Sequence, residues 1–119
     1  MEVTAAKAWA AIEGMFASQS RARLICTRMA LATASKGTSS ISEYFTKMKG
    51  LADDMVSAGQ RLEDEELVSY ILTGLDLEFN LVVFAVAARV EPISIGDLYT
   101  QLVSFKQRME LHVGGSDHQ

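Results

Sequence analysis

The scarcity of proline constrains this chain more than any other feature of its sequence. Pro92 is the only proline in 119 residues, whereas an all-β chain of this length needs turn residues about every 8–12 positions. Apolar residues recur instead at helical spacing, and a serine precedes two of these stretches at a capping position. The sequence therefore predicts an all-α protein, folded as a compact bundle of about six helices.

The six expected helices follow from apolar periodicity and from capping residues. The segment Ser18 to Ser20 is expected to separate the first helix from the second, because serine favours caps and turns over helix interiors. Gly37 is expected as a left-handed C-cap after the second helix, and Ser40 and Ser94 open the third and sixth helices as capping boxes. The expected helices cover approximately residues 5–16, 21–34, 40–58, 63–73, 76–89 and 94–109.

The fifth expected helix is apolar on two opposite sides. Its first stripe has ordinary core spacing and consists of Phe79, Val82, Val83, Val86 and Val90. Its second stripe has spacings of four, three and four and consists of Leu77, Leu81, Phe84 and Ala88. A helix that is apolar all round is buried on both sides. Either it lies inside its own domain, or the second stripe is an exposed patch used in self-association or partner binding. The second interpretation is favoured, because few helices can be fully enclosed in a domain of this size.

The residues that carry most enzyme chemistry are scarce. Cys26, the only cysteine, is expected to be a buried structural thiol, and its isolation fits a reducing intracellular compartment such as the cytoplasm. The two histidines, His112 and His118, fall in the last eight residues, which excludes most zinc sites and histidine-based triads inside the fold. The acidic run 63–66 fits a helix N-terminus better than a metal site. We expect no enzymatic activity, no catalytic, cofactor or metal residues, and no contact with a membrane.

Charge is distributed unevenly along the chain. Residues 1–50 carry seven Lys and Arg against three acidic residues, and residues 51–119 carry four against twelve. Such a chain can associate head to tail or can present its basic end to a polyanion. The candidate RNA contacts are Arg21, Arg23, Arg28 and Lys36. No aromatic residue is interleaved with them as a stacking platform requires, so a solvated helix face is the favoured interpretation and any RNA contact would be weak and non-specific.

Several short segments, in order along the chain, resemble the Gag polyprotein of copia-type LTR retrotransposons in its plant form. Together they cover about Lys7 to Met109, nearly the whole chain. The matching segments are residues 8–9, 16–23, 42–45, 47–53, 58–60, 64–68, 70–75 and 97–99, with Leu102.

The resemblance implies a self-associating, capsid-type helical domain, spanning residues 1–112, with a flexible tail at 113–119. The expected third to sixth helices would correspond to the C-terminal subdomain of retroviral capsids, preceded by two further helices. In those relatives one helix of this subdomain mediates dimers, and by position that role would fall on Leu67, Tyr70 and Ile71. The leading expectation is therefore a homodimer or a higher oligomer.

The sequence also departs from the family pattern. The helical sequence that precedes Trp9 in fuller Gag proteins is short here, the zinc-knuckle segment is missing, and Lys106 stands where the family tends to have an acid. We therefore expect an excised Gag fragment or a shortened, domesticated Gag-derived protein. The alternatives to particle-type assembly are an interaction module that binds a host protein and a weak non-specific RNA binder.

Overall fold

The computed structural model describes the backbone of residues 4–116 and the side chains of residues 4–111. The described chain is helical and has five α-helices instead of the six expected. These are α1 (Ala5–Thr33), α2 (Ile41–Ser57), α3 (Asp64–Thr73), α4 (Asn80–Ala87) and α5 (Ile95–Ser116), with a short 3-10 helix η1 (Leu77–Phe79) directly before α4.

The first two expected helices form one continuous helix, so the predicted break at Ser18 to Ser20 is wrong. Serine costs only about half a kilocalorie per mole relative to alanine inside a helix, far less than proline. The segment around these serines is rich in alanine, the best helix former. Helical backbone hydrogen bonds therefore continue through the serines, and α1 extends for 29 residues, about 43 Å at 1.5 Å per residue.

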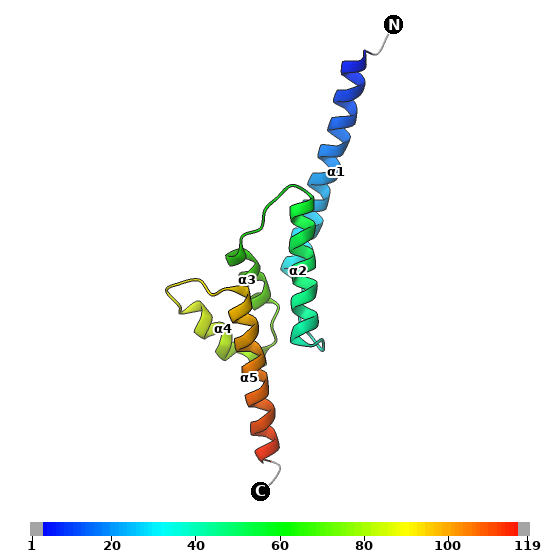
Figure 1. The fold of residues 1–119 in the computed structure, drawn as a ribbon. Helices are drawn as coiled ribbons and strands as arrows, with labels where there is room; N and C mark the ends of the chain where they lie inside the picture. The colour runs from blue at the N-terminus through cyan, green and yellow to red at the C-terminus, as the bar shows by residue number, and fades with distance from the viewer. Residues whose placement is uncertain (1–3, 117–119) are drawn as a thin grey trace.

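The long helix makes the molecule elongated, and the expectation of a compact bundle is wrong. The Cα radius of gyration is 20.7 Å, whereas a compact chain of this length has about 13–14 Å. The principal extents are 88, 31 and 18 Å. Figure 1 shows the N-terminal half of α1 projecting away from the other helices, with the two chain ends at opposite ends of the molecule.

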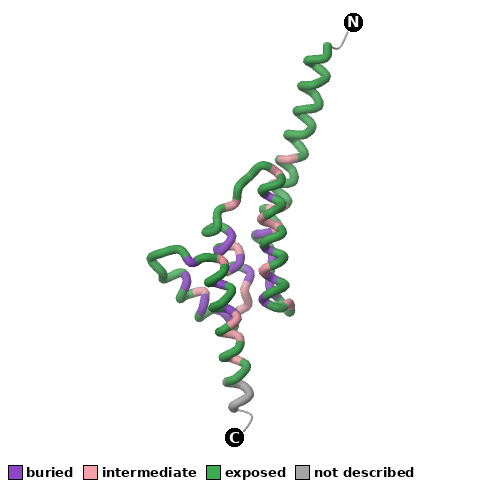
Figure 2. The backbone as a smooth tube through the Cα atoms, in the orientation of Figure 1, coloured by how far each residue is buried: buried purple, intermediate pink, exposed green. Residues whose placement is uncertain are grey.

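The hydrophobic core lies where α2, α3, α4 and α5 pack against one another and against the C-terminal half of α1 (Figure 2). The apolar stripes predicted for these helices supply it, including the first stripe of the fifth expected helix up to Val86. Val90, the last residue of that stripe, is fully exposed beyond the end of α4. The largest fully buried side chains are Leu31, Tyr44, Met48, Met55, Ile71, Phe79, Leu98 and Leu102.

A polar junction joins the α1–α2 loop to the end of α3. The Lys36 amide donates to the Gly74 carbonyl oxygen at 2.9 Å, and the Tyr44 hydroxyl donates to the Ile71 carbonyl oxygen at 2.9 Å. A Cβ at Gly74 would collide with the Tyr44 hydroxyl and the Ala34 carbonyl oxygen. Gly74 has φ −88°, so it is required for close packing and not for a left-handed conformation.

Both predicted capping serines act at helix N-termini. Ser40 Oγ accepts from the Glu43 amide at 3.0 Å, and Ser94 Oγ accepts from the Asp97 amide at 3.1 Å. Gly37 has the predicted left-handed φ, +52°, but it lies in the turn after α1 and is not the C-cap, which is Ala34. The expected tail at 113–119 overlaps the end of α5, and residues 117–119 lie outside the described range.

Candidate interaction surfaces

The second stripe of the fifth expected helix lies on the surface. Leu77 is 83% exposed, Leu81 71% and Phe84 66%, and Ala88 is also exposed. On the opposite side Phe79, Val82 and Val86 are buried in the core, so α4 is anchored by one face and presents the other to solvent. We call the exposed residues Leu77, Leu81, Phe84 and Ala88 the α4 patch.

The residues chosen by family position for dimerisation are placed differently. Leu67 and Ile71 are buried in the chain's own core and Tyr70 is half-buried. These two core side chains therefore do not form a freely accessible surface, because the inner face of α3 is needed to hold the domain together. Both of these side chains line a groove that is described below.

The four candidate RNA contacts do not form one ridge. Arg21 and Arg23 are exposed on α1, whereas Arg28 lies 3.8 Å from a carboxylate oxygen of Glu66. Lys36 lies after the end of α1 and is buried, with its ammonium 5.4 Å from the ring centroid of Phe79. The grouping of Lys36 with the arginines was wrong because α1 ends at Thr33, three residues earlier.

Three further features of the described residues concern reactive groups, metal ions and membranes. Cys26 is exposed on α1, not buried as expected, because the face of α1 on which it lies points away from α2 and α3. No group of three or more His, Cys, Asp or Glu residues in the described part of the chain is placed to hold a metal ion. None of the described helices combines the length and the apolar character needed to cross a membrane.

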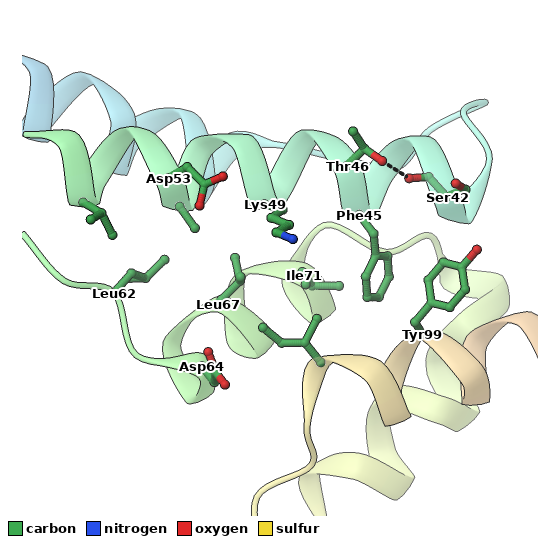
Figure 3. A pocket seen from close by; sticks show the side chains of 13 residues that line it. Ser42, Phe45, Thr46, Lys49, Asp53, Leu62, Asp64, Leu67, Ile71 and Tyr99 are labelled. Atoms are coloured by element: carbon green, nitrogen blue, oxygen red, sulfur yellow. Dashed lines mark hydrogen bonds between the residues drawn. The ribbon is translucent and has the colours of Figure 1, made fainter.

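A groove of about 510 Å³ lies between α2, α3 and the start of α5 (Figure 3). Leu67 and Ile71 contribute to its inner wall, and Phe45 and Tyr99 stand at one end as an edge-to-face pair with ring centroids 5.2 Å apart. The lining residues are Ser42, Phe45, Thr46, Lys49, Ala52, Asp53, Val56, Leu62, Asp64, Leu67, Ile71, Ile95 and Tyr99. We call this feature the α2–α3–α5 groove.

The groove is apolar inside and charged at its edge. Figure 3 shows Lys49 extending from α2 toward the groove, with Leu62, Leu67 and Ile71 across from it. Asp53, in the C-terminal part of α2, and Asp64, the first residue of α3, line the same end of the groove (Figure 3). Helical periodicity identified most of these apolar residues as core, but only the packing angle between the helices leaves them accessible, and the sequence contains no direct signal of that angle.

The surroundings of the buried Tyr44 hydroxyl alter its proton binding. Burial, with a smaller contribution from the negative charge of Asp76, raises the pKa of Tyr44 to about 12. Both causes disfavour the phenolate, so the hydroxyl keeps its proton and its hydrogen bond to Ile71 through the neutral pH range. Tyr44 therefore has a structural role at the junction of α2 and α3.

Every described residue from Thr4 to Gln19 is exposed (Figure 2). We call these residues the N-terminal arm. Trp9, Ile12 and Phe16 form an apolar stripe along it, with Trp9 63% and Phe16 64% exposed. Their spacing of i, i+3 and i+7 places these three residues on one face of α1, but no neighbouring helix of the described chain covers that face.

Comparison with known proteins agrees with the resemblance seen in the sequence. The family described as gag-polypeptide of LTR copia-type matches residues 2–113. A retrovirus-related Pol polyprotein from transposon RE1 of Arabidopsis thaliana is 24% identical over 106 residues, which cover 89% of this chain. The chain spans only 7% of the length of that relative. No solved structure matches the chain.

The match covers nearly the whole chain, so the chain belongs to the copia-type LTR retrotransposon Gag family. The family assignment made from the ordered segments is confirmed. The all-helical class is also confirmed for the described residues, with five helices in place of six.

Proposed function

We propose that this chain is a non-enzymatic structural domain of the Gag type that associates with further copies of itself. Membership in the copia-type Gag family supports the structural role. In this proposal residues 1–112 act as one capsid-type domain, with α2–α5 in the position of the C-terminal capsid subdomain. The observation that carries self-association is the α4 patch, a row of exposed apolar residues along η1 and α4, whose opposite face is buried in the core.

The α4 patch has the properties of a contact between identical subunits. Removing apolar surface from water contributes about 25 cal/mol per Å², and each of the three large side chains on the patch is more than half exposed. Two copies related by a two-fold axis would place this patch against itself, as in an isologous interface. An ion pair at 3.6 Å between Glu78 and Lys106 fixes the start of the patch against α5.

Light scattering coupled to size-exclusion chromatography tests the proposal over a range of protein and salt concentrations. We expect a dimer or a larger species for the wild type, and a shift toward monomer for Leu81→Asp and Phe84→Asp. Val90→Asp is the matched control, because Val90 is also exposed and apolar but lies off the patch. A wild-type chain that stays monomeric at high concentration would contradict the proposal and would direct attention to a different partner protein.

The basic residues give less support to an RNA-binding role. Of the four candidates, Lys36 is buried, and Arg28, although exposed, lies beside the carboxylate of Glu66. Arg21 and Arg23 are the two that remain. Binding through phosphates alone falls steeply with salt. We expect only weak RNA binding at low salt, lost near physiological ionic strength and reduced by Arg21→Ala.

A further inference from the structure

Two apolar features of this chain lack a partner within the described residues. One is the stripe on the N-terminal arm, and the other is the α2–α3–α5 groove. The arm belongs to a continuous helix that points away from the core (Figure 1). A straight α1 cannot bring Trp9 to the groove of its own chain, so an occupant of that groove with the arm's chemistry must come from a second molecule.

We propose that the N-terminal arm of one copy docks in the α2–α3–α5 groove of a second copy, with Trp9, Ile12 and Phe16 facing into it. This inference rests on the proposed self-association but uses surfaces separate from the α4 patch. Helix-in-groove recognition depends on apolar anchors at i, i+3 and i+7, which is the spacing of these three residues.

Charge complementarity fixes the direction in which the arm lies. Glu13 flanks the stripe, about 40° around the helix from Trp9 at 100° per residue, and it is the only acidic residue in the arm. Lys49 is the only basic residue that lines the groove. An arm antiparallel to α2 also brings its N-terminus, the positive end of the helix dipole, to the end of the groove that carries Asp53 and Asp64.

With the arm antiparallel to α2, one register brings the aromatic residues of the arm to apolar residues of the groove and Glu13 to Lys49. When Glu13 is opposite Lys49 in an antiparallel pair, moving four residues from Glu13 back to Trp9 corresponds to moving four residues from Lys49 forward to Asp53. Trp9 is then level with Asp53, between the groove residues Ala52 and Val56. Phe16 then lies beside the edge-to-face pair of Phe45 and Tyr99. Both arm aromatics therefore meet apolar lining residues, and the only flanking acid of the arm meets the only base of the groove.

The proposed contact is heterologous, since different surfaces of the two copies meet. Heterologous contacts form closed rings or open filaments, depending on the rotation between neighbours. In an open assembly, the copy at one end keeps a free arm and the copy at the other end keeps a free groove. Combined with a two-fold contact at the α4 patch, this contact would extend an assembly in a second direction.

The first experiment uses the full chain carrying Leu81→Asp and Phe84→Asp, which removes the α4 contact. Trp9 is the only tryptophan, so its fluorescence reports on the arm alone. With rising concentration we expect its emission to shift to shorter wavelength, together with an increase in mass by light scattering. Adding Val56→Glu in the groove or Phe16→Glu on the arm should weaken association more than tenfold, because each buries an unpaired carboxylate at the contact.

Mixing the two variants gives the decisive result. Neither variant should associate alone. In a 1:1 mixture, the intact arm of the Val56→Glu chain can dock in the intact groove of the Phe16→Glu chain, and the two should form a discrete dimer. Val56 is 59% exposed and Phe16 64% exposed in the single chain, so both variants should keep the parent's circular dichroism and unfolding midpoint. A Val56→Glu variant that still associates with a Trp9 shift would indicate pairing between arms and would overturn the proposal.

A charge exchange tests the register. Glu13→Lys and Lys49→Glu should each weaken association about two- to fivefold, and a mixture or double variant should restore it. Lys47→Glu is the matched control, because Lys47 lies on α2 and is exposed but does not line the groove.

The remaining outcomes separate this proposal from the α4 contact. If the wild type associates but the Leu81→Asp, Phe84→Asp chain is monomeric with solvent-exposed Trp9, the arm–groove contact is wrong and the α4 contact stands. If that chain associates as fully as the wild type, the α4 contact is wrong. A monomer in which Trp9 is already shielded would show that the arm folds onto its own chain, which also overturns the proposal.

Discussion

The two halves of α1 carry apolar residues on the same side of the helix but differ completely in burial. Trp9 in the N-terminal half and Leu31 in the C-terminal half lie within about 40° of each other around the helix axis. Leu31 is fully buried against the rest of the core, whereas Trp9 is 63% exposed. Helical spacing identifies the face that can be buried, but burial also requires a second helix at that level. In this chain α2 begins beside the end of α1 and reaches back only part of its length (Figure 1).

The largest expected difference in the free energy of unfolding is between large-to-small substitutions in the two halves of α1. Leu31→Ala should lower the free energy of unfolding by about 2–5 kcal/mol, because it removes buried methyl groups and leaves a cavity. Trp9→Ala should change it by less than about 0.5 kcal/mol, because Trp9 is exposed in the single chain. Urea unfolding followed by circular dichroism at low protein concentration measures both. Equal effects would show that the arm is part of the cooperative core.

Replacing a glycine with alanine should have opposite effects on stability in the core and in the N-terminal arm. Gly74→Ala should destabilise the fold by about 1–3 kcal/mol, because the new methyl group would overlap Tyr44 and Ala34. Gly14→Ala meets no atom within 4 Å and should favour the helix by up to about 1 kcal/mol. We expect a lower unfolding midpoint for the first and a higher helical content for the second. A neutral Gly74→Ala would contradict the close packing at the α2–α3 junction.

Alkaline titration tests the core alone, through the buried hydroxyl of Tyr44. The folded chain holds the Tyr44 proton to a pKa of about 12, and the unfolded chain releases it near pH 10. The stabilisation is therefore complete below pH 10 and is lost between about pH 10 and 12, amounting to roughly 3 kcal/mol. Tyr44→Phe should remove this part of the pH dependence, and it should lower stability near pH 7 by about 1 kcal/mol through the lost hydrogen bond. Unfolding curves of both proteins from pH 8 to 12 measure the difference, and parallel curves would contradict the role given to Tyr44.

The smallest expected difference concerns the two N-caps. Ser40 caps α2 and Thr4 caps α1, with hydrogen bonds of 3.0 and 3.1 Å to backbone amides. Ser40→Ala should lower the free energy of unfolding by about 1 kcal/mol. Thr4→Ala should only increase fraying of the first turn of the arm, which hydrogen exchange detects and the cooperative unfolding midpoint does not. A shift of the midpoint by Thr4→Ala would connect the arm to the core.

The helices of the core were predictable because each is marked locally. The serines at 40 and 94 and the helical spacing of the apolar residues that follow them define α2 and α5 without knowledge of their neighbours. The second stripe on α4 was visible for the same reason, and its exposure agrees with the favoured interpretation. Whether that stripe associates stays a prediction.

The errors came from features that depend on the balance between weak local signals and tertiary packing. Ser18 and Ser20 favour a break too weakly to interrupt a helix rich in alanine. Lys36 was assigned to a helix face although the helix ends before it. The α2–α3–α5 groove was missed because it depends on the separation and angle of three helices, which residue spacing does not specify.

The continuity of α1 has a consequence for spacing. A single helix keeps a fixed rotational phase from Leu31 to Trp9, so the distance and the facing of the arm relative to the core are both set by residue count. One residue inserted after Ser20 would rotate the arm stripe by about 100°, whereas seven inserted residues would restore its facing and lengthen the arm by about 10 Å. The length of α1 therefore determines how far Trp9 lies from the core, and changes in steps of seven residues keep the arm stripe facing the same way.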